Sequence, residues 1–193
     1  MGLIRRSFDY IDRDVFRLLF SSIVRPHLEY AAPIWNPHLK KHIVLIENVQ
    51  RRATKLVPGL KNLEYSERLK LLKLPTLSYR RYRGDMLELY KLTHGIYDKS
   101  AVDEFLKFKE NSRGHSFNLE KYHCNLDVRK YSFKLRTTDQ WNNLPEEVVK
   151  VQTINQFKSA LDKLWKDSDV MYNADTDVQK ITSERNVHYK TIK

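Results

Sequence analysis

The sequence predicts a mainly α-helical protein: a helical bundle, then a small β-hairpin with further helices, and a disordered C-terminal tail. Its 193 residues include only five glycines and six prolines, whereas Leu, Lys and Glu, which favour helices, are common. Apolar residues recur with helical spacing through most of the chain. After residue 168, however, large apolar residues become rare and Asp, Asn, Thr and Ser dominate, which is typical of a disordered segment.

The first two helices are marked by their capping residues. Asp12 can cap a helix that carries Val15, Phe16, Leu19, Phe20 and Ile23, and Pro26 should end or kink it. Asn36-Pro37 predicts a second start, with asparagine as the cap and proline at the first helical position. Pro58-Gly59 should end that helix, which has two opposite stripes. The apolar stripe is Ile43, Ile46, Val49, Ala53 and Val57, and the polar stripe is Lys41, Asn48, Arg51, Arg52 and Lys55.

The middle of the chain predicts two more helices, over residues 65–73 and 78–94, with Gly95 as the stop of the second. The second helix has one apolar face, formed by Tyr79, Tyr82, Met86, Leu89, Tyr90 and Thr93. Residues 96–112 read as a shorter helix and a loop. From Gly114 the pattern alternates and is rich in aromatic residues, which predicts a β-hairpin over about 114–133.

Two further helices are expected before the tail. The first covers residues 133–142 and stops near Asn143-Leu144-Pro145. The second starts at a capping box, Thr153-Ile-Asn-Gln156, and has a single apolar face. That face comprises Ile154, Phe157, Leu161, Leu164 and Trp165.

The net charge of +11 is unevenly distributed, because nine of the excess positive charges lie in residues 1–100. A basic half beside a nearly neutral half favours a polyanionic partner for the first half, although a lysine-rich solvated surface would look similar. The single cysteine, Cys124, excludes an internal disulfide and fits a reducing compartment. No apolar run approaches the length of a membrane span, and the opening residues match no secretory or myristoylation signal. We expect an intracellular protein of the nucleus or cytoplasm, without a membrane partner.

Several segments, in order, resemble one family. They read SIVRPHLEYAAPIW, ENVQRRATKLVPGLKNLEYSERLKLLKLPTLSYRRYRGDMLELYKL, RGHSFNLEK, LDVRKYSFKLRTTDQWNNLPEEVV and INQFKSALDKLW. Together they are similar to the part that follows the catalytic palm in reverse transcriptases of non-LTR retrotransposons, the jockey-like and chicken-repeat-like elements. The resemblance spans about residues 2–166. It implies a thumb-like helical region over 1–95, a C-terminal connection region over 96–167, and a tail, 168–193, outside the family pattern.

The resemblance implies that the chain binds template–primer nucleic acid but does not catalyse polymerisation. An RNA-directed DNA polymerase of this family needs two magnesium ions held by palm aspartates, one pair of them adjacent. The sequence contains no Asp-Asp pair, and its Glu146-Glu147 doublet follows Pro145 at an expected helix start, where acids offset the helix dipole. We therefore expect no enzymatic activity and no cofactor, since magnesium would serve only the missing palm.

Two groups of cations are candidates for nucleic-acid binding. The stripe formed by Lys41, Arg51, Arg52 and Lys55 projects in one direction, as needed to bridge successive phosphates without reading sequence. An ordinary solvated face would have the same pattern, and the resemblance favours contact. The second group, Arg80, Arg81 and Arg83, fans out around its helix. It is equally consistent with phosphate contact and with local ion pairs such as that of Arg81 with Asp85.

Other residues have an alternative structural interpretation. Tyr30 and Trp35 could stack on a base or sugar, but core packing is the favoured expectation, and Trp141 and Trp165 lie on apolar faces. His115, His123 and Cys124 suggest metal binding only weakly, because structural zinc needs about four ligands in recognisable pairs. The sequence has no nucleophile elbow and no phosphate-binding glycine loop.

The favoured hypothesis is a non-catalytic C-terminal region of a retrotransposon reverse transcriptase. It would bind RNA, DNA or an RNA–DNA hybrid independently of sequence, and the upstream polymerase domain is a possible partner. The alternatives are a helical protein-interaction module, suggested by the many apolar helix faces, and a functionless relic of a decayed element.

Overall fold

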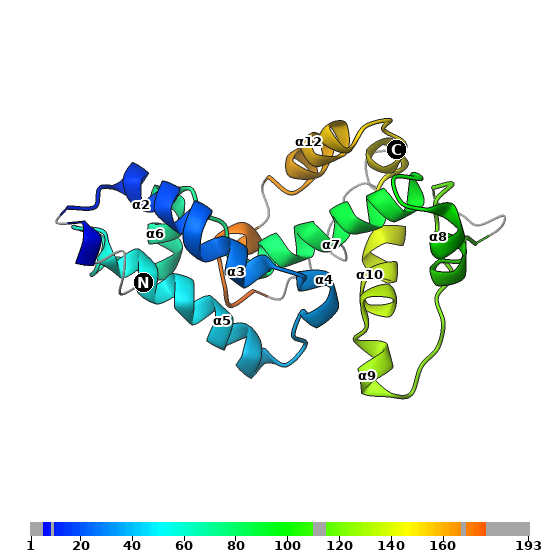
Figure 1. Cartoon of the computed structure of the whole chain (residues 1–193), viewed down its shortest axis with the longest axis horizontal. Coiled ribbons are helices and arrows are strands. Elements are labelled where there is room, and N and C mark those ends of the chain that lie inside the picture. The colour runs from blue at the N-terminus through cyan, green and yellow to red at the C-terminus, as the bar shows by residue number, and fades with distance from the viewer. Residues whose placement is uncertain (1–5, 9, 110–114, 167–168, 177–193) are drawn as a thin grey trace. The chain divides into compact units, whose positions relative to one another are not determined.

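A computed structural model describes residues 6–8, 10–109, 115–166 and 169–176, and Figure 1 shows them. The described part is mainly α-helical with a single isolated β-bridge, so the predicted helical class is confirmed. It forms two compact units. Among the described residues, unit 1 comprises 6–8, 10–81 and 169–176, and unit 2 comprises 82–109 and 115–166. The division falls within helix α7 (Leu77–Thr93), whereas the resemblance places it after residue 95.

Unit 1 begins with an almost unbroken helical run. Helix α2 (Arg13–Leu19) passes into a π-helical turn (Phe20–Val24) and then into α3 (Arg25–Glu29). The predicted cap is confirmed, since the Asp12 carboxylate accepts a hydrogen bond of 2.7 Å from the Val15 amide. Pro26 does not end the helix. A widened turn precedes it, which accommodates a residue that cannot donate the usual backbone hydrogen bond.

The rest of unit 1 consists of short connections and three further helices before α7. Helix α4 (Ala32–Trp35) is followed by α5 (Lys40–Ala53), a 3-10 turn (Thr54–Leu56) and α6 (Tyr65–Leu72). Helix α6 matches its prediction closely and ends with Lys73 in a left-handed conformation. The predicted cap of α5 is wrong: the helix starts at Lys40, and its N-cap is Leu39, which makes no side-chain hydrogen bond.

The core of unit 1 is shared by distant segments. Phe16 and Phe20 belong to one buried cluster with Ala53 at the end of α5, with Val57 just after the 3-10 turn, and with apolar residues of α6. The full buried cluster is Ile11, Phe16, Phe20, Ala53, Val57, Leu60, Tyr65, Leu69, Leu72 and Leu74.

The segment after residue 168 returns to unit 1. A 3-10 turn (Asp169–Met171) buries Val170, and Tyr172 and Ala174 pack against the unit 1 core. Thr76 fixes the segment, because its amide donates to the Met171 carbonyl at 2.9 Å and its hydroxyl to the Val170 carbonyl at 3.2 Å. The expectation of disorder from residue 168 onward is therefore wrong for 169–176. Residues 167–168 and 177–193 lie outside the described residues.

Unit 2 is built around the predicted aromatic face of α7. Its helices are α8 (Lys99–Phe105), α9 (Asp127–Lys130), α10 (Phe133–Asn142), α11 (Glu146–Val149) and α12 (Ile154–Leu164). Tyr82 stacks on Trp165 and Tyr90 on Phe157, with ring centroids 4.8 and 4.5 Å apart. Trp141 and Trp165 are fully buried, as expected. Both helix signals are confirmed, since Gly95 has φ +68° and Thr153 with Gln156 forms the capping box.

The predicted β-hairpin is wrong within the described residues 115–133. The second run forms α9 and the start of α10, and the first run pairs with residues 107–109 through one antiparallel bridge, Phe108 with Leu119. The Asn142 side chain accepts from the Leu119 amide and donates to the Leu119 carbonyl, both at 2.8 Å. This side chain takes the place of a second strand. Gly114, the start of the expected hairpin, lies outside the described residues.

Candidate nucleic-acid interface

Three of the four cations on the predicted α5 stripe are exposed. Lys41, Arg52 and Lys55 lie on the solvent side of α5 and of the 3-10 turn that continues it. Lys41 and Arg52 are eleven residues apart, so they project within about 20° of each other and about 16 Å apart along the axis. The Arg52 Nε also donates to the Asn48 carbonyl at 3.3 Å. We call these three residues the α5 cationic face.

Arg51, the fourth member of the predicted stripe, is placed differently. Its guanidinium lies over the Tyr65 ring, 4.8 Å from the centroid, and its buried Nε has no hydrogen-bond partner among the described residues. The Arg68 guanidinium also lies over this ring, at 5.5 Å. Arg51 is therefore part of the packing between α5 and α6 rather than of the exposed face.

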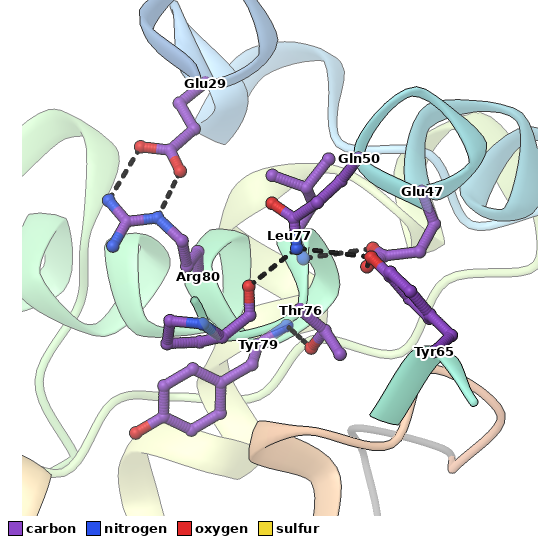
Figure 2. Close-up of polar contacts among 9 residues, drawn as sticks. Glu29, Glu47, Gln50, Tyr65, Thr76, Leu77, Tyr79 and Arg80 are labelled. Carbon is purple, nitrogen blue, oxygen red and sulfur yellow. Dashed lines mark hydrogen bonds and ion pairs between the residues drawn. The ribbon is translucent and has the colours of Figure 1, made fainter. Parts of the chain in front are cut away.

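A buried polar network lies on the inner side of α5 (Figure 2). Glu47, only 3% exposed, accepts hydrogen bonds from the Tyr65 hydroxyl at 2.7 Å and the Leu77 amide at 3.0 Å. Gln50 donates to the Pro75 carbonyl at 2.9 Å and to the Tyr65 hydroxyl at 3.2 Å. The network joins α5 to α6 and to the first turn of α7. The Glu47 carboxylate therefore lies on the buried side of α5, opposite the cationic face.

The pKa of Glu47 reflects this position. Burial raises the pKa of the carboxyl above its ordinary value, because the charged form loses its hydration. The hydrogen bond from Tyr65 and the nearby positive charge of Arg81 act in the opposite direction. Burial also raises the pKa of the Tyr65 hydroxyl, so this phenol stays a donor.

The arginines of α7 all make contacts within their own unit. Arg80 forms a two-pronged ion pair with Glu29, through its Nε and, at 2.9 Å, its Nη2 (Figure 2). Arg81 is 3% exposed and donates from Nε to the Asn36 side chain at 3.0 Å and from Nη2 to the Ser78 hydroxyl at 3.2 Å. These interactions place both arginines in the framework of unit 1.

Arg83 belongs to unit 2. Its Nε and Nη2 donate to the two carboxylate oxygens of Asp162 on α12, at 2.6 and 2.8 Å. Asp85, which the sequence suggested as a partner of Arg81, receives two hydrogen bonds from Arg136. In the unit 2 framework, arginine–aspartate pairs thus connect α7 to α10 and α12.

The aromatic residues before α5 are not core residues. Tyr30 is 81% exposed and Trp35 is 39% exposed, so the expectation of core packing is wrong for Tyr30 and only partly met by Trp35. The turn between α3 and α4 explains this, because Ala31 has φ +52° and redirects the chain after Tyr30. The Trp35 indole N–H donates to the Tyr30 carbonyl at 2.5 Å.

The residues considered for metal binding do not form a cluster. His115 is buried, with its Nε2 2.9 Å from the Trp141 carbonyl, and burial lowers the pKa of its ring. The Cys124 thiol contacts the Leu126 carbonyl at 3.6 Å. Within the described ranges, no group of three or more His, Cys, Asp or Glu side chains could hold a metal ion. No helix in those ranges is both long and apolar enough to cross a membrane.

The acceptors that bind the α7 arginines lie far from them in the sequence. Glu29, Asn36 and Asp162 lie 51, 45 and 79 residues away from the arginines they bind. No local pattern could have identified them, because side-chain pairing is readable from sequence only at helical spacings of three or four residues. Asn36, interpreted as a helix cap, accepts a hydrogen bond from Arg81.

Comparison with known proteins gives no relative: no family model matches the chain, and no curated protein and no solved structure shows significant similarity to it.

Proposed function

We propose that this chain is the non-catalytic thumb and connection region of a reverse transcriptase of the non-LTR retrotransposon type. It binds the backbone of RNA, DNA or an RNA–DNA hybrid independently of sequence. The ordered family-like segments motivate the origin, and the exposed α5 cationic face supports the binding activity. Without an adjacent aspartate pair to hold magnesium, the chain supplies contact with the duplex rather than chemistry.

The carrying observation is that the two acids of the segment that forms the cationic face, residues 25–60, are paired or buried. Between residues 25 and 60 the only acidic residues are Glu29 and Glu47. Glu29 is paired with Arg80, and Glu47 is buried in the polar network. The exposed charge of this segment is therefore positive, with Lys41, Arg52 and Lys55 presented together. Such a face attracts phosphates through counterion release, which needs no base contact.

The test is a titration of the whole chain against a fluorescently labelled RNA–DNA hybrid at two salt concentrations. The variant K41E/R52E/K55E reverses the cationic face. The control K99E/K107E/K163E makes the same charge change at three exposed lysines of unit 2. We expect binding that weakens as salt rises, a loss of about 100-fold in the first variant, and a several-fold loss at most in the control.

Two results would contradict this proposal. One is the absence of binding by the unmodified chain at low salt. The other is an equal loss in both variants, which would mean that net charge rather than the α5 face determines affinity.

A protein-interaction module is the second candidate, and exposed apolar residues of α5 favour it. Val44 and Leu45 are 42% and 62% exposed, whereas Glu47 and Gln50 of the same helix are buried. This inversion of the usual pattern leaves apolar surface available to a protein. Light scattering separates the candidates: a defined oligomer that ignores nucleic acid supports the module, and a salt-sensitive monomeric binder supports the first proposal.

A further inference from the structure

The turn between α3 and α4, together with α4 itself, presents apolar side chains to solvent. Tyr30 and Ile34 are 81% and 85% exposed, and Trp35 is 39% exposed, within six consecutive residues. Ala32, between them, is buried and anchors the turn. Two of the three exposed residues are aromatic, and we call Tyr30 and Trp35 the aromatic pair.

The hydrogen bond within the aromatic pair determines what kind of contact Trp35 can make. The indole has one polar atom, its N–H, and the Tyr30 carbonyl already accepts a hydrogen bond from it. The exposed part of Trp35 is therefore ring surface that has no donor to satisfy. Such a ring suits stacking rather than a directed hydrogen bond, and the bond also ties the ring to the backbone of Tyr30.

The electrostatic surroundings identify the type of partner. Lys40 and Lys41 open α5 five and six residues after Trp35, and the first turn of that helix contains no acidic residue. The acid nearest to the aromatic pair in sequence, Glu29, is paired with Arg80. Exposed aromatic rings that are followed within six residues of sequence by exposed cations, with Glu29 paired and Glu47 buried, complement an anionic ligand with flat faces. Proteins that bind single-stranded nucleic acid use this combination.

We infer that the aromatic pair stacks on an unpaired base, so the preferred ligand is a duplex with a single-stranded extension. The inference rests on the proposed backbone binding and specifies its ligand. Bases inside a duplex are stacked on their neighbours and cannot reach a protein ring, whereas an unpaired base can. The cationic face then holds phosphates, and the aromatic pair holds the base beyond the duplex end.

Tryptophan fluorescence gives a direct signal for this stacking. The chain has three tryptophans, and Trp141 and Trp165 are 0% and 1% exposed, so Trp35 alone can meet a ligand base. A blunt RNA–DNA hybrid and the same hybrid with a five-nucleotide extension are titrated into the unmodified chain. We expect quenching and about tenfold tighter binding only with the extension. Trp35→Phe keeps an aromatic ring and should bind similarly without the quenching.

Substitutions then separate stacking from general binding. Tyr30→Ala and Trp35→Ala should lose the preference for the extension and keep the affinity for the blunt hybrid. The high exposure of Tyr30 makes its variant safe for folding. Ile34→Ala, which removes an equally exposed but non-aromatic side chain, should keep the preference.

The possible failures are distinguishable. Equal binding of both ligands by the unmodified chain overturns the stacking inference and leaves the proposed backbone binding intact. Absence of binding to either ligand overturns both. If Tyr30→Ala breaks an oligomer in light scattering without changing the ligand preference, the aromatic pair is a protein contact and the inference is wrong.

Discussion

The outer face of α5 and the start of α7 are both rich in cations, but the structure places these cations in opposite environments. Lys41, Arg52 and Lys55 of the first stretch remain exposed. In the second, Arg80 is paired with Glu29 and Arg81 is buried against Asn36. Both stretches are basic in the sequence, and the difference lies in the acceptors that the tertiary structure brings to each arginine.

This difference explains how a basic surface can be maintained beside a packed core. The two acids of residues 25–60 bind partners within unit 1. Glu29 pairs with Arg80 of α7, and Glu47 accepts hydrogen bonds from Tyr65 and from the amide of Leu77 at the start of α7. Because Arg80 neutralises the Glu29 carboxylate by pairing with it, Glu29 does not cancel the positive field of the exposed cations. The α7 arginines of unit 1 therefore support the α5 face without forming part of it.

The largest expected effect on stability comes from Arg81. Replacing it by methionine keeps the apolar stem but removes the hydrogen bonds from the guanidinium to Asn36 and Ser78 and a positive charge near Glu47. We expect the free energy of unfolding to fall by about 2 kcal/mol in urea titrations. The control is Arg83→Met, which breaks the more exposed pair with Asp162. It should lower the free energy of unfolding by a smaller amount. Unchanged stability with weakened hybrid binding would place Arg81 among the ligand contacts instead.

The adjacent residues Arg51 and Arg52 give a sharper comparison. Arg51→Ala should lower the free energy of unfolding by about 1 kcal/mol, because it removes the contact with the Tyr65 ring. Arg52→Ala should leave stability within about 0.5 kcal/mol and weaken hybrid binding several-fold. Melting curves and binding titrations of the two variants test this. An exchange of the two outcomes would show that the assignment of the two arginines is reversed.

The Glu29–Arg80 pair should contribute modestly. Its side chains are 26% and 30% exposed, so solvent screens the attraction. A double-mutant cycle with Glu29→Gln and Arg80→Gln should give a coupling free energy of about 0.5–1 kcal/mol. A coupling near zero would mean that the pair does not hold Glu29 away from the cationic face.

The smallest effect is a pH dependence from Glu47. Its pKa in the folded chain is above the ordinary 4.5, so the folded state keeps this proton to higher pH than the unfolded state does. We expect the free energy of unfolding of the unmodified chain, relative to that of Glu47→Gln, to be highest below pH 4.5. It should decline as pH rises through the folded pKa. Urea unfolding of both proteins between pH 4 and 7 measures it, and a difference that grows with pH would contradict the burial of this carboxyl.

Local signals in the sequence predict much of the helical framework. Helix α10 has the predicted bounds, α7 begins one residue early and buries its predicted face, and the capping box of α12 forms as expected. These features depend on residues three or four positions apart, which a sequence shows directly.

Features set by distant partners were not predictable in this way. Within the described residues 115–133 the Asn142 side chain, rather than a second strand, bonds the backbone of Leu119, and Thr76 holds residues 170 and 171. In the candidate site, the stripe that includes Arg51 and Arg52 was visible as a helical pattern. Which of its members reach solvent depends on Tyr65, which lies on another helix.

The salt dependence of binding tests the central claim most directly. The logarithm of the association constant for an RNA–DNA hybrid is measured against the logarithm of salt concentration for the unmodified chain and for K41Q/R52Q/K55Q. Each phosphate contact adds slightly less than one to the slope, so the variant should be shallower by about two to three. The matched variant K99Q/K107Q/K163Q should keep the original slope. Equal slopes for all three proteins would contradict the assignment of phosphate binding to the outer face of α5.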